Sequence, residues 1–394
     1  MSRRTALAAT AYAFGVAMAS TTLPTPLYVL YRERFGFSQL MITVIFATYA
    51  VGVISGLLLF GRLSDDIGRR RTLIPGLLLA AASAAAFLTL QGLGLILAGR
   101  ILSGLSAGIF TGTATAAITE LAAPGGEARA TLVATVANIG GLGCGPLLAG
   151  AIAEWVPDPL RVVFIVDLAL LAAALVLVYR MPERVAEPDF HLRVQWPAVP
   201  DAARAVFIRA AIAGFAGFAV LGLFTAVAPA FLGSIMGVHS HVVVGLVVFA
   251  VFGASTVGQA GSSAVERQVA LVGGCATLGG GAVILGVGLA TSSLALLVGG
   301  GMIAGAGQGL SFRAAVEAVT GAAPAERRGE TSSAFFVVAY VAISLPVVGV
   351  GALAEAASLR IAGLVFTGVV AALAVIAAGM LHRVERRERP AAAA

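Results

Sequence analysis

The sequence contains no lysine: all 25 basic residues among its 394 are arginine, and they stand against 19 acidic residues. A nucleotide-binding loop of ATP-driven machines needs a lysine, and so does a Schiff-base enzyme, so both classes are excluded. Charged residues are scarce, at 11%, where soluble proteins have about 25%. The two cysteines, Cys144 and Cys275, lie in apolar runs. They indicate small packing residues, not a disulfide framework or a metal site.

Most of the residues are instead apolar. Hydrophobic residues make up 59%, there are 49 glycines, and the mean hydropathy is +0.99. A membrane-spanning helix needs roughly 20 mostly apolar residues, so twelve would use roughly 240. Apolar runs between charged or Pro/Gly-rich breaks predict twelve spans, at 6–30, 39–61, 72–91, 94–121, 130–153, 161–180, 206–234, 241–262, 269–290, 293–319, 332–354 and 361–381. The sequence therefore predicts an all-α integral membrane protein.

The first apolar run imitates a cleavable signal peptide. Arg3 and Arg4 precede it, and residues 17–19 read AMA, a small-residue pattern typical of a cleavage site. We expect an uncleaved first helix, because its removal would leave an odd number of spans and break the internal repeat described below.

The arginines predict the orientation. With both termini in the cytoplasm, nineteen arginines lie on the cytoplasmic side, and two lie inside spans, Arg100 and Arg313. The outer side then holds four: Arg32, Arg34, Arg161 and Arg360. Cytoplasmic loops of membrane proteins carry the excess of arginine, so both termini are predicted to be cytoplasmic. Scattered arginines also argue against a nucleic-acid surface.

The chain repeats itself at a spacing near 200 residues. Residues 104–108 (GLSAG) are echoed by 305–309 (GAGQG), Pro146 by Pro346, and 150–154 (GAIAE) by 351–355 (GALAE). We therefore expect two pseudo-symmetric six-helix halves facing each other, as in rocking transporters. Their predicted limits are 1–180, a polar cytoplasmic linker at 181–205, and 206–394 with a short cytoplasmic tail.

The loop after the second span carries the most specific motif. Residues 61–71 read GRLSDDIGRRR, which resembles the signature Gly-x-Leu-x-Asp-x-x-Gly-Arg-Arg/Lys of the major facilitator superfamily. The resemblance covers essentially the whole chain and implies the major facilitator fold. Asp66 departs from the family pattern, which usually has a basic residue there.

The resemblance gives this loop a role as a cytoplasmic latch. Gly61 and Gly68 would allow a tight connection. Asp65 would hold the start of span eleven through its helix dipole, and Arg69 would bridge to Glu120 near the end of span four. The alternative is a solvated loop that only fixes topology. Residues 261–267 (GSSAVER) are at most a decayed copy of the motif.

Two further patterns are similar to family signatures. Arg100 precedes Gly104 by four residues, as in the intramembrane arginine signature of span four; it either faces a cavity or reaches the outer interface. In span five, residues 141–150 (GLGCGPLLAG) look like the antiporter signature, with Gly141, Gly145, Pro146 and Gly150 matching and Ala149 replacing a glycine. In the family this pattern accompanies twelve-span drug–proton antiporters. Plain small-residue packing explains the glycines equally well.

Few acidic residues lie within the predicted spans: Asp167 in span six, Glu317 in span ten, and Glu120 near the end of span four. A carboxyl group at membrane depth can exchange a proton, so these three are the candidates for proton coupling. Asp167 has no obvious local partner and is the first choice. Glu317 follows Arg313 by four residues, so an i,i+4 pair is predicted, with a structural or a gating role. Span one lacks the aspartate that many family exporters carry and offers hydroxyl groups instead, at Ser20, Thr21, Thr22, Thr25 and Tyr28.

A substrate cavity would collect polar and aromatic groups from several spans. The candidates are Arg100, Tyr49, Asn138, Phe224, Gln308, Phe312, Arg313 and Tyr340, with Phe218, Phe252 and Phe336. Together they would suit an amphipathic organic compound. His239 and His241 flank Ser240 in an outer loop, where two histidines indicate polar loop residues more than a metal site.

These features favour a secondary transporter that exports small hydrophobic or amphipathic organic compounds, driven by protons, by alternating access. The alternatives are uptake or exchange of an organic anion bound by Arg100 and Arg313 and, more remotely, a membrane-embedded enzyme. We expect a monomer in a bacterial cytoplasmic (inner) membrane, with protons, lipid and a small molecule as partners, and with no cofactor, metal or nucleic acid.

Overall fold

The computed structural model of the chain describes residues 1–61, 63–89, 92–183, 185 and 194–392. Three of the arginines counted for topology, Arg62, Arg184 and Arg193, and part of the predicted linker (184 and 186–193) lie outside these residues. Within the described ranges every regular element is a helix, and no strand occurs. The all-α prediction is therefore confirmed.

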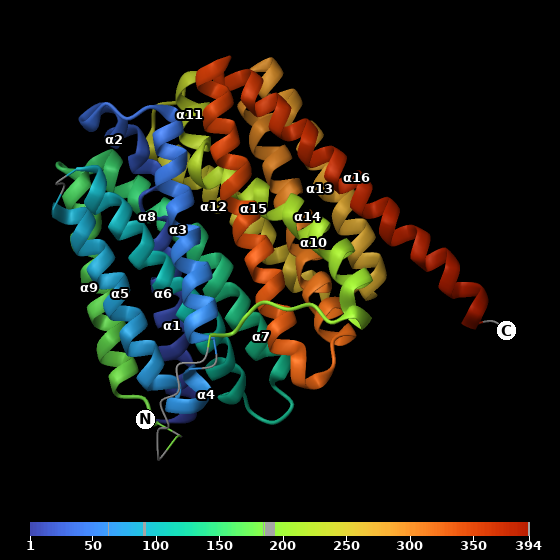
Figure 1. Cartoon of the computed structure of the whole chain (residues 1–394). Helices are drawn as coiled ribbons and strands as arrows, with labels where there is room; N and C mark the ends of the chain where they lie inside the picture. The colour runs from blue at the N-terminus through green and yellow to red at the C-terminus, as the bar shows by residue number, and fades with distance from the viewer. Residues whose placement is uncertain (62, 90–91, 184, 186–193, 393–394) are drawn as a thin grey trace. The chain divides into compact units, whose positions relative to one another are not determined.

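The described residues group into two compact units, Met1–Trp196 with Ser240–Phe249, and Pro197–His239 with Ala250–Ala394. Unit 1 contains α1 (Arg3–Thr22), the 3-10 turn η1 (Thr25–Leu27), α2 (Tyr28–Phe35), α3 (Gln39–Phe60), α4 (Leu63–Ile67), α5 (Arg69–Thr89), α6 (Leu93–Glu120), α7 (Glu127–Thr135), the π-helical turn η2 (Val136–Gly140), α8 (Gly141–Trp155) and α9 (Pro159–Tyr179) (Figure 1).

Unit 2 contains α10 (Asp201–Ala226), α11 (Ala228–Ser234), α13 (Arg267–Thr291), α14 (Leu294–Ala322), the 3-10 turn η3 (Ala325–Arg327), α15 (Arg328–Ala356) and α16 (Leu359–Ala392). Helix α12 (His241–Ser262) belongs to both units: its residues up to Phe249 group with unit 1 and the rest with unit 2.

By length and composition, twelve helices or helix pairs among the described residues could cross a membrane. They follow the order predicted from the sequence, so the twelve-span prediction is confirmed. The first span differs in being longer, Arg3–Phe35, and broken. The helical path is interrupted after Thr22 because neither Pro24 nor Pro26 has an N–H to donate to a carbonyl four residues earlier.

Helices α3 and α6 approach so closely that side chains are excluded from the seam between them. Gly52 and Gly56 of α3 face Gly104 and Gly108 of α6. A Cβ atom on Gly104 would lie 2.8 Å from the backbone nitrogen of Val53, and one on Gly108 would lie 2.7 Å from the carbonyl oxygen of Val53. Each helix thus presents a glycine every fourth residue, the spacing that lets membrane helices pack backbone to backbone.

Unit 2 contains the counterpart of this seam. Gly305 and Gly309 of α14, the residues that echo Gly104 and Gly108, pack against the backbone of α12. A Cβ atom on Gly305 would lie 2.5 Å from the carbonyl oxygen of Val251, and one on Gly309 would lie 2.8 Å from the backbone nitrogen of Gln259. The sequence repeat therefore corresponds to one packing device used once in each unit.

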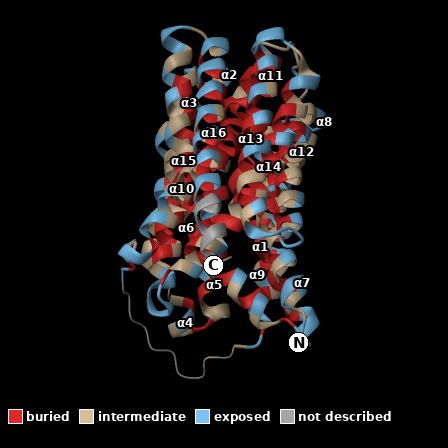
Figure 2. Ribbon diagram, turned by 90° about the vertical axis from the view of Figure 1, so that its right-hand side faces the viewer, coloured by how far each residue is buried: buried red, intermediate tan, exposed pale blue. Residues whose placement is uncertain are grey.

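Buried positions gather on the faces that the helices of each unit turn toward one another (Figure 2). Exposed apolar residues such as Val51, Val176 and Val257 cover the outer faces. A hydrophobic exterior fits a lipid environment, since lipid imposes no penalty on exposed apolar side chains.

Replacing Gly104 by leucine tests the α3–α6 seam. The added side chain has no space, so we expect a loss of about 1–3 kcal/mol in the free energy of unfolding and a lower thermal midpoint of the detergent-purified protein. Gly112→Ala on the same helix is the control, because nothing lies within 4 Å of its Cβ position. Equal thermal midpoints for the two variants would contradict the close packing of α3 against α6 at Gly104.

Candidate functional site

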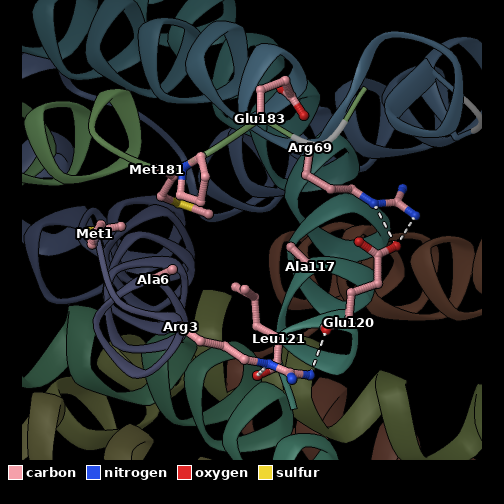
Figure 3. Close-up of a pocket in the computed structure, with 10 residues that line it drawn as sticks. Met1, Arg3, Ala6, Arg69, Ala117, Glu120, Leu121, Met181 and Glu183 are labelled. Atoms are coloured by element: carbon pink, nitrogen blue, oxygen red, sulfur yellow. Dashed lines mark hydrogen bonds and ion pairs between the residues drawn. The ribbon is translucent and has the colours of Figure 1, made fainter. Parts of the chain in front are cut away.

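The loop between α3 and α5 is organised around Arg69, the first residue of α5. Its Nη2 atom lies 2.6 Å from Oε1 of Glu120 at the end of α6 (Figure 3). Its Nη1 atom lies 2.7 Å from Oδ1 of Asp65. The guanidinium also donates to the hydroxyl of Ser64. Arg69 and Glu120 thus form the ion pair that the family resemblance implies, and one arginine joins α4, α5 and α6.

Both glycines of the motif stand where a side chain would not fit. Gly68 has a φ of 102°, in the left-handed region that favours glycine. At Gly61 a Cβ atom would lie 2.6 Å from the carbonyl oxygen of Leu57. The carboxylate of Glu183 accepts from the backbone nitrogen of Arg71 at 3.1 Å, which fixes the chain after α9 against the start of α5.

The end of α6 is held by a second arginine. Arg3 donates to the backbone carbonyls of Glu120, Leu121 and Ala122, which are among the carbonyls that a helix C-terminus leaves without partners. A pocket of about 260 Å³ lies between these groups (Figure 3). It is lined by Met1, Arg3, Ala6, Arg69, Ala117, Glu120, Leu121, Met181, Pro182 and Glu183.

Arg100 of α6 is enclosed within unit 1, with 1% of its surface exposed. Its Nη1 atom donates to the carbonyl oxygen of Thr21 at 2.6 Å, and its guanidinium stacks over the rings of Tyr49, at 4.9 Å, and Phe46, at 5.6 Å. Because α1 ends at Thr22, the carbonyl of Thr21 belongs to the negative end of that helix, which favours a cation. The alternative in which Arg100 reaches the outer interface is wrong.

Asp167 of α9 is equally buried, with 2% exposed. Its Oδ2 atom accepts from the hydroxyl of Ser20 at 2.7 Å, the one hydrogen-bond partner it has in the part of the chain that the structure describes. The sequence pointed to Asp167 but not to this partner, which lies 147 residues away on span one. Ser20 and Thr21 are consecutive, so the last turn of α1 contacts both Asp167 and Arg100.

The residues of the antiporter-like pattern in α8 contact two helices, α1 and the first part of α12. Gly141 and Gly145 pack on α1, where a Cβ atom on Gly141 would lie 2.7 Å from the carbonyl oxygen of Gly15. Pro146 has no N–H for the carbonyl of Leu142, and the Thr22 hydroxyl donates to that carbonyl at 2.8 Å instead.

The second half of the pattern faces the first part of α12. Gly245 packs on the backbone of Pro146, and a Cβ atom on Gly150 would lie 3.4 Å from Cα of Gly245. One turn further, the carboxylate of Glu154 accepts from the backbone nitrogen of His241 at 2.7 Å and from the hydroxyl of Ser240 at 3.1 Å. Glu154 therefore caps the start of α12, a role that the sequence analysis missed.

The remaining candidates lie in separate places. The predicted i,i+4 pair forms in unit 2, where Nε of Arg313 lies 3.1 Å from Oε1 of Glu317, and the Glu317 side chain is 53% exposed. Asn138 is half-buried in η2 of unit 1.

The other candidates of unit 2 are internal. Phe224 and Gln308 are each 1% exposed and Tyr340 is 9% exposed. The Gln308 amide oxygen accepts from Ser255 at 2.5 Å. Phe312 stacks with Phe335 and meets the rings of Phe218 and Phe336 edge-on. The structure therefore brings together Arg100 with Tyr49 in unit 1 and an aromatic cluster around Phe312 in unit 2.

Arg100→Lys tests the account of the intramembrane arginine. A lysine keeps the charge but lacks the planar fork that donates to a carbonyl while stacking on two rings. We expect a loss of about 1–3 kcal/mol in the free energy of unfolding, seen as a lower thermal midpoint. Arg360→Lys, at an exposed arginine that also donates to a backbone carbonyl, is the control and should change stability by less than about 0.5 kcal/mol. An unchanged midpoint for Arg100→Lys would contradict the account.

Comparison with known proteins identifies the family to which the chain belongs. The model of the Major Facilitator Superfamily matches residues 5–345. Among solved structures, the chain is similar to a bacterial homologue of the human lysosomal transporter Spinster in an inward-facing, unoccupied conformation, with a TM-score of 0.70 and 14% identity. That match covers 97% of this chain and 98% of the other. A search of curated proteins found no match. The protein belongs to the major facilitator superfamily.

Proposed function

We propose that this transporter exports small hydrophobic or amphipathic organic compounds in exchange for protons, by alternating access, from a bacterial cytoplasm. The observation that carries the proposal is Asp167, a carboxyl group enclosed within a membrane span whose described partner is a neutral hydroxyl. A carboxylate without a cation is costly at membrane depth, and a proton removes that cost. Asp167 is therefore our candidate for the coupling proton.

The last turn of α1 offers a route from this proton to the rest of unit 1. Protonation of Asp167 removes a charge that the Ser20 hydroxyl stabilises, and Thr21, the next residue, accepts from Arg100. The helix ends just beyond, at Thr22, so this turn is not held by a continuous helix on its far side. Transporters place coupling sites at such interrupted helices. We propose that the state of Asp167 sets the position of this turn.

The latch role of the loop after span two is also a proposal. It is supported by the contacts of Arg69 with Asp65 and Glu120, which use the charges of the motif, and by the positive φ of Gly68. A loop that served topology alone would need the arginines but not these glycine and aspartate positions. Glu120 is better explained by this pair than by proton coupling.

The anion-transport alternative has less support. Arg313 already has a carboxylate partner in Glu317. Arg100 donates to the backbone carbonyls of Thr21 and Phe46 and lies over two aromatic rings. Export of a neutral or amphipathic compound requires neither charge. An Arg313→Ala variant tests the choice, because full export by that variant would exclude a substrate anion bound at Arg313.

The variant Asp167→Asn tests whether Asp167 carries the coupling proton. The amide keeps the size of the side chain and its hydrogen bond to Ser20 but cannot be ionised. We expect substrate binding to persist, while accumulation driven by a pH gradient falls about tenfold or more, to the level of gradient-free proteoliposomes. Transport of a fluorescent amphipathic cation across a set pH gradient, with binding measured separately, provides both readouts.

Asp158→Asn is the matched control. Asp158 lies just before the same helix, is half-exposed and pairs with Arg161, and its left-handed backbone suits asparagine. This variant should accumulate substrate like the original protein. Unchanged proton-driven accumulation by Asp167→Asn would refute the assignment.

A further inference from the structure

Unit 2 contains a second pocket at the same place in its fold as the pocket beside Arg69 in unit 1. It has a volume of about 300 Å³ and is lined by residues of α10, α13 and α14 and by Leu381 of α16. In unit 1 the corresponding pocket is lined from α1, α5 and α6 and by Met181 after α9. The helix order in each unit makes these lining elements equivalent, since the internal repeat relates α6 to α14 at an offset of 201 residues.

Residues at equivalent positions of α6 and α14 line the two pockets. Ala117 and Leu121 line the first pocket, and Ala318 and Ala322, 201 residues later, line the second. Between them, Glu120 of unit 1 corresponds to Gly321. Nothing lies within 4 Å of a Cβ atom placed on Gly321. The second pocket thus has open space where the first has an acidic side chain.

An arginine at the first residue of the corresponding helix, α5 or α13, occurs in both units, although the acid occurs in unit 1 alone. Arg69 is the first residue of α5, and Arg267 is the first residue of α13 and lines the second pocket. Arg209 of α10 lines it as well. Neither arginine has a hydrogen-bond or ion-pair partner within the residues that the structure describes.

No acidic residue is among those that line this pocket. Of the acids on α10, α13 and α14, Glu317 pairs with Arg313, and Oδ1 of Asp201 lies 3.5 Å from Nη1 of Arg204. The amide of Gln268 is tied to the carbonyl oxygen of Leu381 at 2.9 Å, which fixes α13 against α16. The pocket is therefore a preformed cavity with two positive charges and no lining countercharge.

We propose that this pocket binds an anion bearing a phosphate group, held by Arg209 and Arg267. Guanidinium groups bind phosphate oxygens through paired, charge-assisted hydrogen bonds, and the volume is at the lower end of small-molecule sites. Arg209 and Arg267 are among the nineteen arginines that the orientation predicted from the sequence assigns to the cytoplasmic side. The phosphate can therefore come from an anionic lipid headgroup of the inner leaflet or from a soluble phosphate.

The experiment uses the full chain purified in phosphate-free detergent solution, in two arms. In the first, equal amounts of phosphatidylglycerol and phosphatidylcholine are added, and retained lipid is measured by native mass spectrometry. In the second, inorganic phosphate is titrated and the thermal midpoint is followed. Retention of phosphatidylglycerol alone identifies a lipid headgroup, whereas a midpoint that rises with phosphate shows that a free phosphate suffices.

Variants locate the binding. Arg209→Gln and Arg267→Gln should each weaken it about tenfold, the effect of losing about 1.4 kcal/mol. Gly321→Glu restores the acid found in unit 1 and should abolish binding by pairing with Arg267. Arg204→Gln, on α10 but outside the pocket, should bind like the original protein. The proposal is overturned if neither phosphatidylglycerol nor phosphate binds, or if the Arg209 and Arg267 variants bind as the original does.

Discussion

Inside a bilayer no water is available to a charge or to an unpaired carbonyl, so each must find its partner within the protein. The first span shows how this constraint organises unit 1. Pro24 and Pro26 end α1 inside the span and leave carbonyls without donors, and Arg100 from α6 supplies one. The arginine in turn needs a negative partner, and the broken helix end provides it without any carboxylate. Two features that are each unfavourable alone, a broken helix and a buried cation, therefore stabilise each other.

The same turn of α1 contacts the buried carboxyl group of Asp167. An aspartate and an arginine on separate helices are thus connected through two consecutive residues, Ser20 and Thr21, and among the described residues no ion pair joins them directly. A direct pair would hold both charges in one state. In the proposed mechanism, two separate contacts at the end of an interrupted helix let Asp167 gain and lose a proton while Arg100 keeps its carbonyl partner. This arrangement suits a coupling element better than a permanent ion pair does.

Most of the fold could be predicted from the sequence because a bilayer requires long apolar helices. Each such helix is one continuous stretch of sequence and can be recognised without knowing its neighbours. The glycine repeat could be read as well, and the seams at Gly104 and Gly305 show why it exists: only glycine allows the backbones to touch. The motif around Arg69 was readable because its charges are close in sequence, apart from Glu120, which the family resemblance supplied.

The contacts that no local pattern encodes were missed. Ser20 lies 147 residues from Asp167, and Glu154 lies 87 residues from the His241 nitrogen that it accepts from. One serine among several hydroxyl residues on span one gives no sign of which one faces span six. In the sequence, the start of α12 appeared only as a polar loop, so nothing connected it to Glu154. Pairings of this kind depend on helix rotation and register, which hydropathy does not determine.

The two units share a scaffold but not its charges. Along α6, Arg100 and Glu120 carry opposite charges at depth and at the helix end; the residues 201 positions later on α14 are Gly301 and Gly321. The ring of Phe224 fills the space beside Gly301, where a Cβ atom would lie 2.9 Å from its Cε2 atom. The space beside Gly321 stays open. At Gly301, the counterpart of Arg100, an aromatic ring therefore fills the space that a side chain would take. At Gly321, the counterpart of Glu120, no acid is present, and Arg209 and Arg267 line an open cavity. Unit 1 thus holds Arg100 and Asp167 in its interior, whereas Arg209 and Arg267 of unit 2 line an open pocket.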